Sequence, residues 1–382
     1  MITMKKVIFI VSSLRRSGPI IVLQNILRNL EPTRYIAEII KLMDDDPTRS
    51  ITNEFISMGV PIHELHLTKL QIELQSARVA RLIERILVDI KPDVVHAHGY
   101  QPVIVASKLK IKVPKIETLH CISKEDYTMG RGLLMGLYMH RRYILAQRHL
   151  DGAAAISQAV KNYYLDIHPN VKIRCIYNGV HLPETERNRS KAEHRNNLGL
   201  ATDAKIFVVI ASLSERKDPL TVIKAFQIAF PANTETKVKL IFLGKGILHD
   251  KCKSVIGNDQ RITLAGWKPD VYDYLAAADY SISASHSEGF GLSFVESLAV
   301  GTPIIATDIP AFNDFFSLYQ DLTQYRFEVG NVNMLANKMR KAVNESVDIK
   351  DVSEDVLTRF SDTTMSNGYM DFYDEIISSF IH

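Results

Sequence analysis

Short apolar runs rich in valine and isoleucine alternate along this chain with longer stretches in which apolar residues recur every three to four positions. The longer stretches predict amphipathic helices, as at residues 20–30, 77–90, 219–230 and 292–300. The short runs predict buried strands at residues 7–11, 37–42, 94–96, 115–119 and 153–156, and again at 205–211, 239–243, 262–264, 280–283 and 303–306. Regular alternation of strand and helix is typical of parallel sheets that are covered by helices on both faces.

The alternation forms two series, each about as long as one doubly wound sheet. We therefore expect an α/β protein with two Rossmann-like doubly wound domains, residues 1–182 and 201–360, that face each other across a cleft. Residues 183–200 are polar, contain Pro183 and show no apolar period, and they are expected to be a linker. Because ligands of such sheets bind at the carboxyl ends of the strands, the loops that follow the strands are the segments to search for chemistry.

The length of 382 residues fits two domains, and a composition of 46% apolar and 23% charged residues excludes a disordered or collagen-like chain. The three cysteines form no C-x-x-C pair, which argues against structural zinc and against an oxidising compartment. No apolar run approaches the roughly 18 residues of a transmembrane helix, and the run at residues 7–11 is too short for a signal peptide. We therefore expect a cytoplasmic protein.

The net charge of +3 conceals an asymmetry, because residues 1–180 hold 25 Lys and Arg against 16 Asp and Glu, whereas the remainder holds 21 against 27. The basic half is expected to contact something anionic, such as a phosphorylated ligand or a lipid headgroup. No nucleic-acid partner is expected, because the chain has no nucleic-acid-binding motif and its cations are not interleaved with stacking aromatics.

The most informative segment is a glycine-containing loop after a predicted strand of the second half. Glu288 stands at its tip, and Gly289 and Gly291 allow a ligand to approach the backbone closely. The helix predicted after the loop offers free N–H groups to phosphate oxygens, and it carries Glu296 eight residues after Glu288. Both carboxylates are placed to accept hydrogen bonds from sugar and ribose hydroxyls. The alternative, for either glutamate alone, is a surface loop followed by an exposed helix.

Residues 288–308, EGFGLSFVESLAVGTPIIATD, resemble the E-x7-E signature of the family 4 retaining glycosyltransferases with the GT-B fold, also called glycosyl transferases group 1. Further segments are similar to family motifs in order and spacing: DVVHAH at 93–98, YNGV at 177–180, LGKG at 243–246 and LAGW at 264–267. Residues 361–382 resemble the family's last helix, which crosses back to the first domain. The resemblance implies a GT-B fold whose second domain binds most of a nucleotide sugar.

The resemblance also implies a role for individual residues. Glu288 would bind the hydroxyls of the donor sugar, Glu296 the ribose and Lys217 the diphosphate. Glu288 and Lys217 are the expected catalytic residues, together with His120 of the first domain. The residues expected to bind the donor, with the base near the Gly-Trp pair, are Gly18, Arg216, Lys217, Gly244, Gly266, Trp267, Glu288, Gly289, Phe290, Gly291, Leu292 and Glu296.

The segment ASLSERKDP, residues 211–219, follows the first predicted strand of the second domain. In the family this loop carries an arginine and a lysine that bind the diphosphate, and a cation here lies beside the start of a helix. Lys217 matches the lysine, but Ser212 stands at the position of the arginine. Arg216 is expected either to supply the second cation or to be a solvated surface arginine.

In the first domain, Gly18 follows the first predicted strand at a place where family members often carry a Gly-Gly pair. His120 ends the strand predicted at residues 115–119, where the resemblance implies a histidine near the transferred sugar; the alternative is a buried histidine whose hydrogen bonds are satisfied. His96 and His98 share one face of a strand, and without a third ligand a structural role is favoured over metal binding.

Asp44, Asp45 and Asp46 satisfy the D-x-D pattern by which another glycosyltransferase fold holds a divalent metal. They follow a predicted strand and precede Pro47, and they are expected to form a solvated acidic loop. Because cations and a helix dipole supply the charge that a diphosphate needs, we expect neither a metal nor a cofactor.

Nine Lys and Arg residues lie within residues 108–148, around a markedly apolar piece at 132–139. Such a basic surface is expected to lie on anionic lipid, which would make the protein peripheral on the inner face of the membrane. The apolar piece itself is expected to pack on the sheet of its own domain.

The expected function is that of a metal-independent retaining glycosyltransferase that uses a nucleotide-diphosphate sugar, with UDP favoured over GDP. The acceptor would be a saccharide or lipid-linked saccharide of bacterial surface polysaccharide synthesis. The alternatives are a catalytically silent, nucleotide-sugar-binding regulatory partner and a nucleotide-sugar epimerase on the same scaffold. A Rossmann oxidoreductase is disfavoured, because no G-x-G-x-x-G follows the first strand.

Overall fold

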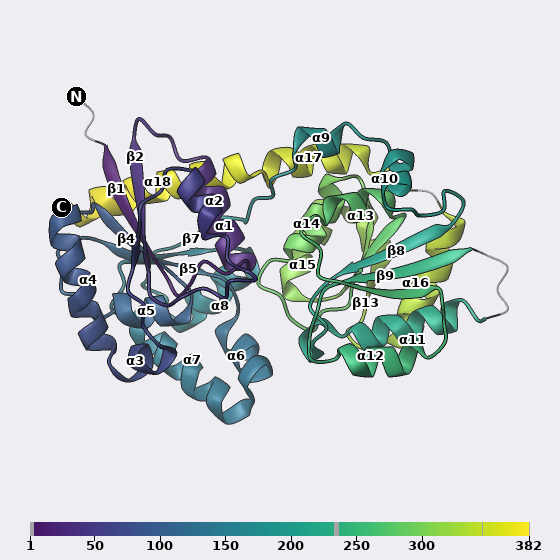
Figure 1. Cartoon of the computed structure of the whole chain (residues 1–382), viewed down its shortest axis with the longest axis horizontal. Helices are drawn as coiled ribbons and strands as arrows, with labels where there is room; N and C mark the ends of the chain where they lie inside the picture. Colours follow the sequence, from purple (N-terminus) through teal and green to yellow (C-terminus); the bar gives the residue numbers. More distant parts are fainter. Residues whose placement is uncertain (1–3, 233–236, 346, 382) are drawn as a thin grey trace. The chain divides into compact units, whose positions relative to one another are not determined.

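The computed structural model describes residues 4–232, 237–345 and 347–381; the expected domains also include residues 1–3, 233–236, 346 and 382, which lie outside the described residues. The chain divides into two compact units, the first made of Met1–Gly179 with Ser361–His382 and the second of Val180–Phe360. Each unit is a parallel sheet with helices on both faces (Figure 1). This architecture is the one that the alternation of strands and helices predicts.

The first unit contains a seven-stranded sheet of order β3-β2-β1-β4-β5-β6-β7. Val7 of the interior strand β1 pairs with Ala37 of β2 and with Val94 of β4. Residues 7–11 are fully buried, which explains why this run is continuously apolar. The strands are β1 (Lys5–Val11), β2 (Tyr35–Lys41), β3 (Ile62–Glu64), β4 (Val94–His98), β5 (Lys115–Leu119), β6 (Gly152–Ala155) and β7 (Ile173–Cys175).

The helices of the first unit include one from the C-terminal end of the chain, α18, which is yellow in Figure 1. Tyr35 Oη donates a hydrogen bond to Met370 O (2.9 Å), and Ser366 Oγ donates to Ile26 O (3.0 Å). The helices are α1 (Gly18–Arg28), α2 (Thr52–Ser57), α3 (Lys69–Leu74), α4 (Ser76–Ile90), α5 (Tyr100–Ala106), α6 (Ser123–Arg131), α7 (Leu133–Gln147), α8 (Gln158–Ile167) and α18 (Asp362–Ile381).

The second unit contains a six-stranded sheet of order β10-β9-β8-β11-β12-β13. Its strands are β8 (Lys205–Ile210), β9 (Val238–Leu243), β10 (Ile262–Gly266), β11 (Tyr280–Ser283), β12 (Ile304–Thr307) and β13 (Arg326–Phe327). Its α-helices are α9 (Glu184–Arg187), α10 (Lys191–Asn197), α11 (Pro219–Ala229), α12 (His249–Ile256), α13 (Tyr272–Ala277), α14 (Leu292–Ala299), α15 (Pro310–Leu318), α16 (Val332–Asn344) and α17 (Lys350–Arg359), with 3-10 turns η1 (Glu215–Lys217) and η2 (Gln320–Tyr325).

The segment that is expected to be a linker, residues 183–200, lies within the second unit and holds α9 and α10. Arg195 of α10 is buried; its Nη2 donates to Asp279 Oδ2 (2.7 Å) and its Nε to Ala277 O (2.9 Å). His194 Nδ1 lies 2.6 Å from Asp273 Oδ1. Polar contacts rather than an apolar stripe hold this helix, which is why the sequence shows no apolar period here. The expected domain boundaries themselves stay a prediction.

The piece at residues 132–139, which we expected to pack on its sheet, lies mostly exposed in α7. That expectation is wrong, because only Gly136 of these eight residues is buried. Among the described residues, no helix combines the length and the apolar character that crossing a bilayer requires.

Candidate active site

The loop between β11 and α14 holds the signature residues of the second unit. Gly291 lies at the N-cap of α14 with φ +91°, and a Cβ there would lie 2.4 Å from the ring of Phe312. Phe290 is buried and packs on the ring of Phe315, with centroids 5.2 Å apart, so its side chain anchors the loop. Gly289 and Leu292, on either side of this Phe-Gly pair, are half-buried. Any contact of Phe290 with a donor would therefore come from its backbone.

The side chain of Glu288 is nearly buried and forms salt bridges with Arg216 and Lys217. We call these three residues the Glu288 cluster. Arg216 Nη1 donates to Glu288 Oε2 (3.2 Å), Lys217 Nζ donates to Glu288 Oε1, and Ser285 Oγ donates to the same oxygen (2.8 Å). Burial alone would raise the pKa of Glu288, but the Lys217 ammonium and the Arg216 guanidinium outweigh it and hold that pKa below its usual value. The carboxylate is therefore ionised at neutral pH.

The two cations come from the 3-10 turn η1, which is fixed to the Glu288 loop by backbone contacts. Arg216 Nη1 donates to Ser287 O (2.7 Å), and His286 N donates to Arg216 O (2.8 Å). Asp218 ends the turn at φ +44° and caps α11 by accepting from Thr221 N (3.2 Å). Arg216 is thus tied into the cluster, contrary to the alternative of a solvated surface arginine.

Two glycine turns of the second unit meet at the ends of β9 and β10. Gly244 N donates to Gly266 O (2.8 Å), which joins the two loops. A Cβ on Gly244 would lie 1.9 Å from Ala211 O, so that only glycine fits this close approach. Gly266 has φ +73°, and the side chain of Trp267 beside it is exposed. An exposed indole at a strand end is available for stacking on a flat ligand.

Glu296 lies on α14 and is half-buried. Burial raises its pKa to about 7. Within the described part of the chain, no hydrogen bond joins this carboxylate to another residue. A half-buried carboxylate with no protein partner costs stability, and it is satisfied when a ligand brings hydroxyl donors.

Three histidines of the first unit form a row at the ends of β4 and β5. His96 is satisfied on both ring nitrogens, by Tyr373 Oη (2.9 Å) and Thr118 Oγ1 (2.8 Å), in accord with a structural role. His98 Nδ1 lies 3.2 Å from His120 Nε2. Burial lowers the pKa of His120 to about 3, so the ring is neutral. No hydrogen bond in the described residues uses His120 Nδ1, which leaves this nitrogen for a ligand.

The loop that begins α1 at Gly18 is fixed by one of the three consecutive aspartates. Asp45 accepts from Leu14 N (2.6 Å), Ser50 Oγ (2.9 Å) and Thr52 Oγ1 (2.5 Å) and pairs with Lys41 Nζ (3.1 Å). The expectation of a solvated acidic loop is therefore wrong for Asp45, whose side chain is nearly buried, although Asp44 and Asp46 are both exposed.

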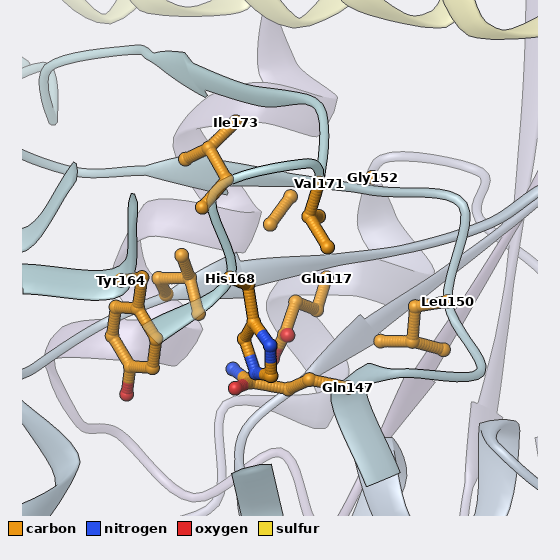
Figure 2. Close-up of a pocket in the computed structure, with 10 residues that line it drawn as sticks. Glu117, Gln147, Leu150, Gly152, Tyr164, His168, Val171 and Ile173 are labelled. Atoms are coloured by element: carbon orange, nitrogen blue, oxygen red, sulfur yellow. The ribbon is translucent and has the colours of Figure 1, made fainter. Parts of the chain in front are cut away.

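A cavity of about 10 Å³ in the first unit includes a glutamate that the sequence analysis did not single out. Glu117 of β5 is buried and accepts a hydrogen bond from Tyr143 Oη (2.5 Å), and burial raises its pKa to about 7. Figure 2 shows its carboxylate near the polar ends of Gln147 and His168. The volume suits about one water molecule and not a nucleotide. An acidic residue in the middle of a strand that is predicted to be buried is the signal that would have found it.

Two family models match the chain. The model described as Glycosyl transferases group 1 matches residues 190–355, and the model described as Glycosyltransferase Family 4 matches residues 21–183. The chain is 24% identical over 379 residues to the O-antigen biosynthesis glycosyltransferase WclY of Escherichia coli, which covers 97% of this chain and 98% of the relative. It is 32% identical over 220 residues to alpha-monoglucosyldiacylglycerol synthase of Streptococcus pneumoniae, which covers 54% of this chain and 49% of that relative.

Solved structures share the fold of the chain. Sucrose-phosphate synthase of Thermosynechococcus elongatus has a TM-score of 0.81 at 15% identity and covers 98% of this chain and 100% of its own. Anabaena HepE in complex with UDP and glucose has a TM-score of 0.75 at 17% identity and covers 97% and 100%. The two family models together span most of both units, and the chain therefore belongs to the family 4 glycosyltransferases, which have the GT-B fold.

Proposed function

We propose that this glycosyltransferase moves a sugar from a nucleoside-diphosphate sugar, with UDP-sugar favoured, to a saccharide or lipid-linked acceptor, and that it retains the anomeric configuration. The observation that carries the proposal is the Glu288 cluster, in which two cations and one carboxylate lie beside the start of α14. The printed names of two relatives support a surface-polysaccharide acceptor: WclY is named for O-antigen biosynthesis and TuaC of Bacillus subtilis, 23% identical over 342 residues, for teichuronic acid biosynthesis. Structures of Anabaena HepE with UDP support the choice of base.

The chemistry follows from the charges of the cluster. As the bond to the diphosphate breaks, negative charge grows on the leaving group, and Lys217, Arg216 and the free N–H groups of α14 stabilise it. When a phosphate oxygen takes the Lys217 ammonium, Glu288 is released to accept hydrogen bonds from the donor sugar. An acceptor hydroxyl then attacks on the face from which the diphosphate leaves and gives its proton to that diphosphate, and positioning replaces a covalent intermediate.

The remaining donor contacts would use groups of the second unit that have no hydrogen-bond partner among the described residues or that are exposed. We propose that Glu296 accepts hydrogen bonds from the ribose and that the base lies against Trp267, next to the joined turns of Gly244 and Gly266. The ribose would supply hydrogen-bond donors to the half-buried Glu296 carboxylate, and the base would cover the exposed indole of Trp267.

We propose that no divalent metal takes part. The diphosphate needs about two positive charges, and Lys217 and Arg216 supply them in place. Within the Asp44–Asp46 segment, Asp45 is committed to hydrogen bonds that hold two loops of the first unit. Asp44 lies with Glu64 and His66 in an exposed group that could hold an ion, but this group belongs to the first unit, whereas Lys217 and Arg216 belong to the second.

For the first unit we propose acceptor binding near Gly18 and His120, and contact between the basic residues of 108–148 and the inner face of a membrane. Nδ1 of His120 is the atom that a sugar or acceptor hydroxyl would meet. A cytoplasmic location, peripheral to the membrane, is part of the same proposal.

The experiment that tests the function measures UDP release from UDP-sugars in a chelating buffer, with and without a panel of lipid-linked saccharide acceptors. We expect release that depends on acceptor, and a loss equivalent to about 2–4 kcal/mol of transition-state stabilisation in Lys217→Ala. Binding of UDP-sugar without acceptor-dependent release would instead indicate a silent regulatory protein. Activity that appears only when magnesium or manganese is added would overturn metal independence.

A further inference from the structure

The helices α6 and α7 form a hairpin whose connecting end is apolar and exposed. Six large apolar side chains of residues 129–138, which we call the hairpin tip, have between 38% and 85% of their surface exposed: Met129, Leu133, Leu134, Met135, Leu137 and Tyr138. Leu134 is the most exposed of them. Soluble monomers rarely leave such a cluster uncovered unless it meets a partner.

The tip is held in a fixed shape by glycine. Gly132 connects the helices at φ +80°, and a Cβ on Gly136 would lie 2.4 Å from the backbone of Thr128. The two helices therefore pack backbone to backbone, which turns their apolar side chains outward. At the base of α7, Tyr143 donates to Glu117 and Arg142 Nη2 donates to Glu73 O (2.9 Å), which fixes the hairpin to the rest of the first unit.

The charges around the tip select the kind of partner. Residues 127–150 contain four arginines and no aspartate or glutamate, and the acidic residues of the hairpin, Glu125 and Asp126, lie in the first turn of α6, at the end away from the tip. Arg142 pairs with Glu73, whereas Arg131 and Arg141, on either side of the apolar residues, are exposed. The partner should therefore be apolar where it meets Leu134 and anionic around it.

We propose that the hairpin tip inserts its apolar side chains into the interface of an anionic lipid bilayer, with Arg131 and Arg141 at the headgroups. A second copy of the chain fits less well, because a two-fold contact through the tip would bring arginines of both copies together without an acidic group. This inference deepens the proposed membrane contact of the first unit, on which it rests, and it is independent of the proposed glycosyl transfer. Insertion of the apolar tip adds a hydrophobic contact to the electrostatic one, and salt does not screen a hydrophobic contact.

The test compares two sets of substitutions in the full chain. Leu133→Gln, Leu134→Gln and Met135→Gln together remove the apolar tip while keeping residues that favour a helix. The matched control, Met4→Gln, Ile56→Gln and Val88→Gln, removes three apolar side chains of similar exposure (52–68%) elsewhere in the first unit. Thermal unfolding of both variants checks that they fold. Flotation with phosphatidylglycerol–phosphatidylethanolamine vesicles, at low salt and at about 0.5 M salt, gives the partition coefficient.

We expect the tip variant to partition at least tenfold more weakly than wild type, and to lose the binding that wild type retains at high salt, while the control variant binds like wild type. Tryptophan placed by Leu134→Trp should be quenched by brominated lipid, and tryptophan placed by Val88→Trp should not. Unchanged binding of a folded tip variant would mean that cations alone make the contact, and the insertion would be refuted. No vesicle binding by wild type would refute insertion and membrane contact together. Wild-type self-association that the tip variant loses, without any effect on vesicles, would assign the tip to a second copy instead.

Discussion

At the scale of single residues, Glu288 carries the sharpest consequence of the structure. Its carboxylate is held by the same two cations that we propose for the diphosphate. Glu288→Ala should lower activity by about 1–3 kcal/mol, because sugar hydroxyls would lose their acceptor. Glu288→Gln, which keeps one acceptor oxygen, should fall between wild type and Ala. Because neither variant competes for Lys217 as a carboxylate does, UDP should bind both at least as tightly as wild type in calorimetry.

Two results would contradict this role of Glu288. Full activity of Glu288→Ala would remove it from sugar recognition. A loss of UDP affinity in step with activity would assign it to the nucleotide instead of the sugar.

Glu296 gives a prediction about pH. Burial raises its pKa from an ordinary 4.5 to about 7, so the folded state binds this proton more tightly than the unfolded state does. The free energy of unfolding therefore falls as pH rises from 4.5 to 7 and the carboxyl ionises in a poorly solvated place. Glu296→Gln should be more stable than wild type by about 2–3 kcal/mol at pH 8, and equal to it near pH 4.5.

The stability of Glu296→Gln should come with weaker UDP binding, since the carboxylate that we propose for the ribose is lost. Chemical denaturation at the two pH values and calorimetry with UDP measure both effects. A variant that gained stability without losing UDP affinity would exclude Glu296 from the ribose site.

Residue identities were easier to predict from the sequence than residue partners. Glycine and glutamate spacing indicated the loop of Glu288 and the helix of Glu296. The pairing of Glu288 with Arg216 and Lys217 could not be predicted, because about 70 residues separate them and only the alignment of β8 with β11 brings their loops together. Whether Arg216 pairs or is solvated was equally undecided in the sequence, since the geometry of the turn η1 determines it.

At the scale of elements, the buried contacts of α10 predict how strongly this helix stabilises the second unit. Arg195→Met removes three hydrogen bonds to Asp279, Ala277 and Thr202 while keeping an apolar stem. Breaking a buried pair from one side typically costs about 3 kcal/mol. Arg189→Met, which removes an exposed arginine that pairs with Glu186 and Asp273, should cost less than about 1 kcal/mol. Chemical denaturation compares the two variants, and a cost of less than about 1 kcal/mol for Arg195→Met as well would show that its buried contacts contribute little to the stability of the second unit.

Strands long enough to show a clear apolar pattern were predicted from the sequence, whereas short edge strands were missed. All ten predicted strands are present, but the edge strands β3, β7 and β13 have only two or three residues, too few to show a period. The apolar residues of α7 were expected to be buried because the segment is rich in them. This expectation failed because α6 and α7 pack closely at Gly136, which turns the apolar side chains outward, and composition does not show such a contact.

At the scale of the whole molecule, the excess of cations in the first half of the chain predicts salt-sensitive membrane binding. Each cation near an anionic surface contributes about 1 kcal/mol, and the cations within residues 108–148 other than Arg142, which pairs with Glu73, should act together. Partition of the wild-type chain onto anionic vesicles should therefore exceed partition onto neutral ones and fall as salt rises. Equal binding to both kinds of vesicle at every salt concentration would show that these cations do not contact lipid.

The central claim is that the Glu288 cluster supports metal-free transfer of a sugar with retention of configuration. The measurement that tests it most directly is the anomeric configuration, by proton NMR, of the product formed from an α-linked UDP-sugar and a lipid-linked saccharide in a chelating buffer. We expect an α-linked product, formed by wild type at the same rate with and without chelator and much more slowly by Lys217→Ala. A β-linked product, or turnover that stops in chelator and returns with added metal, would contradict the claim.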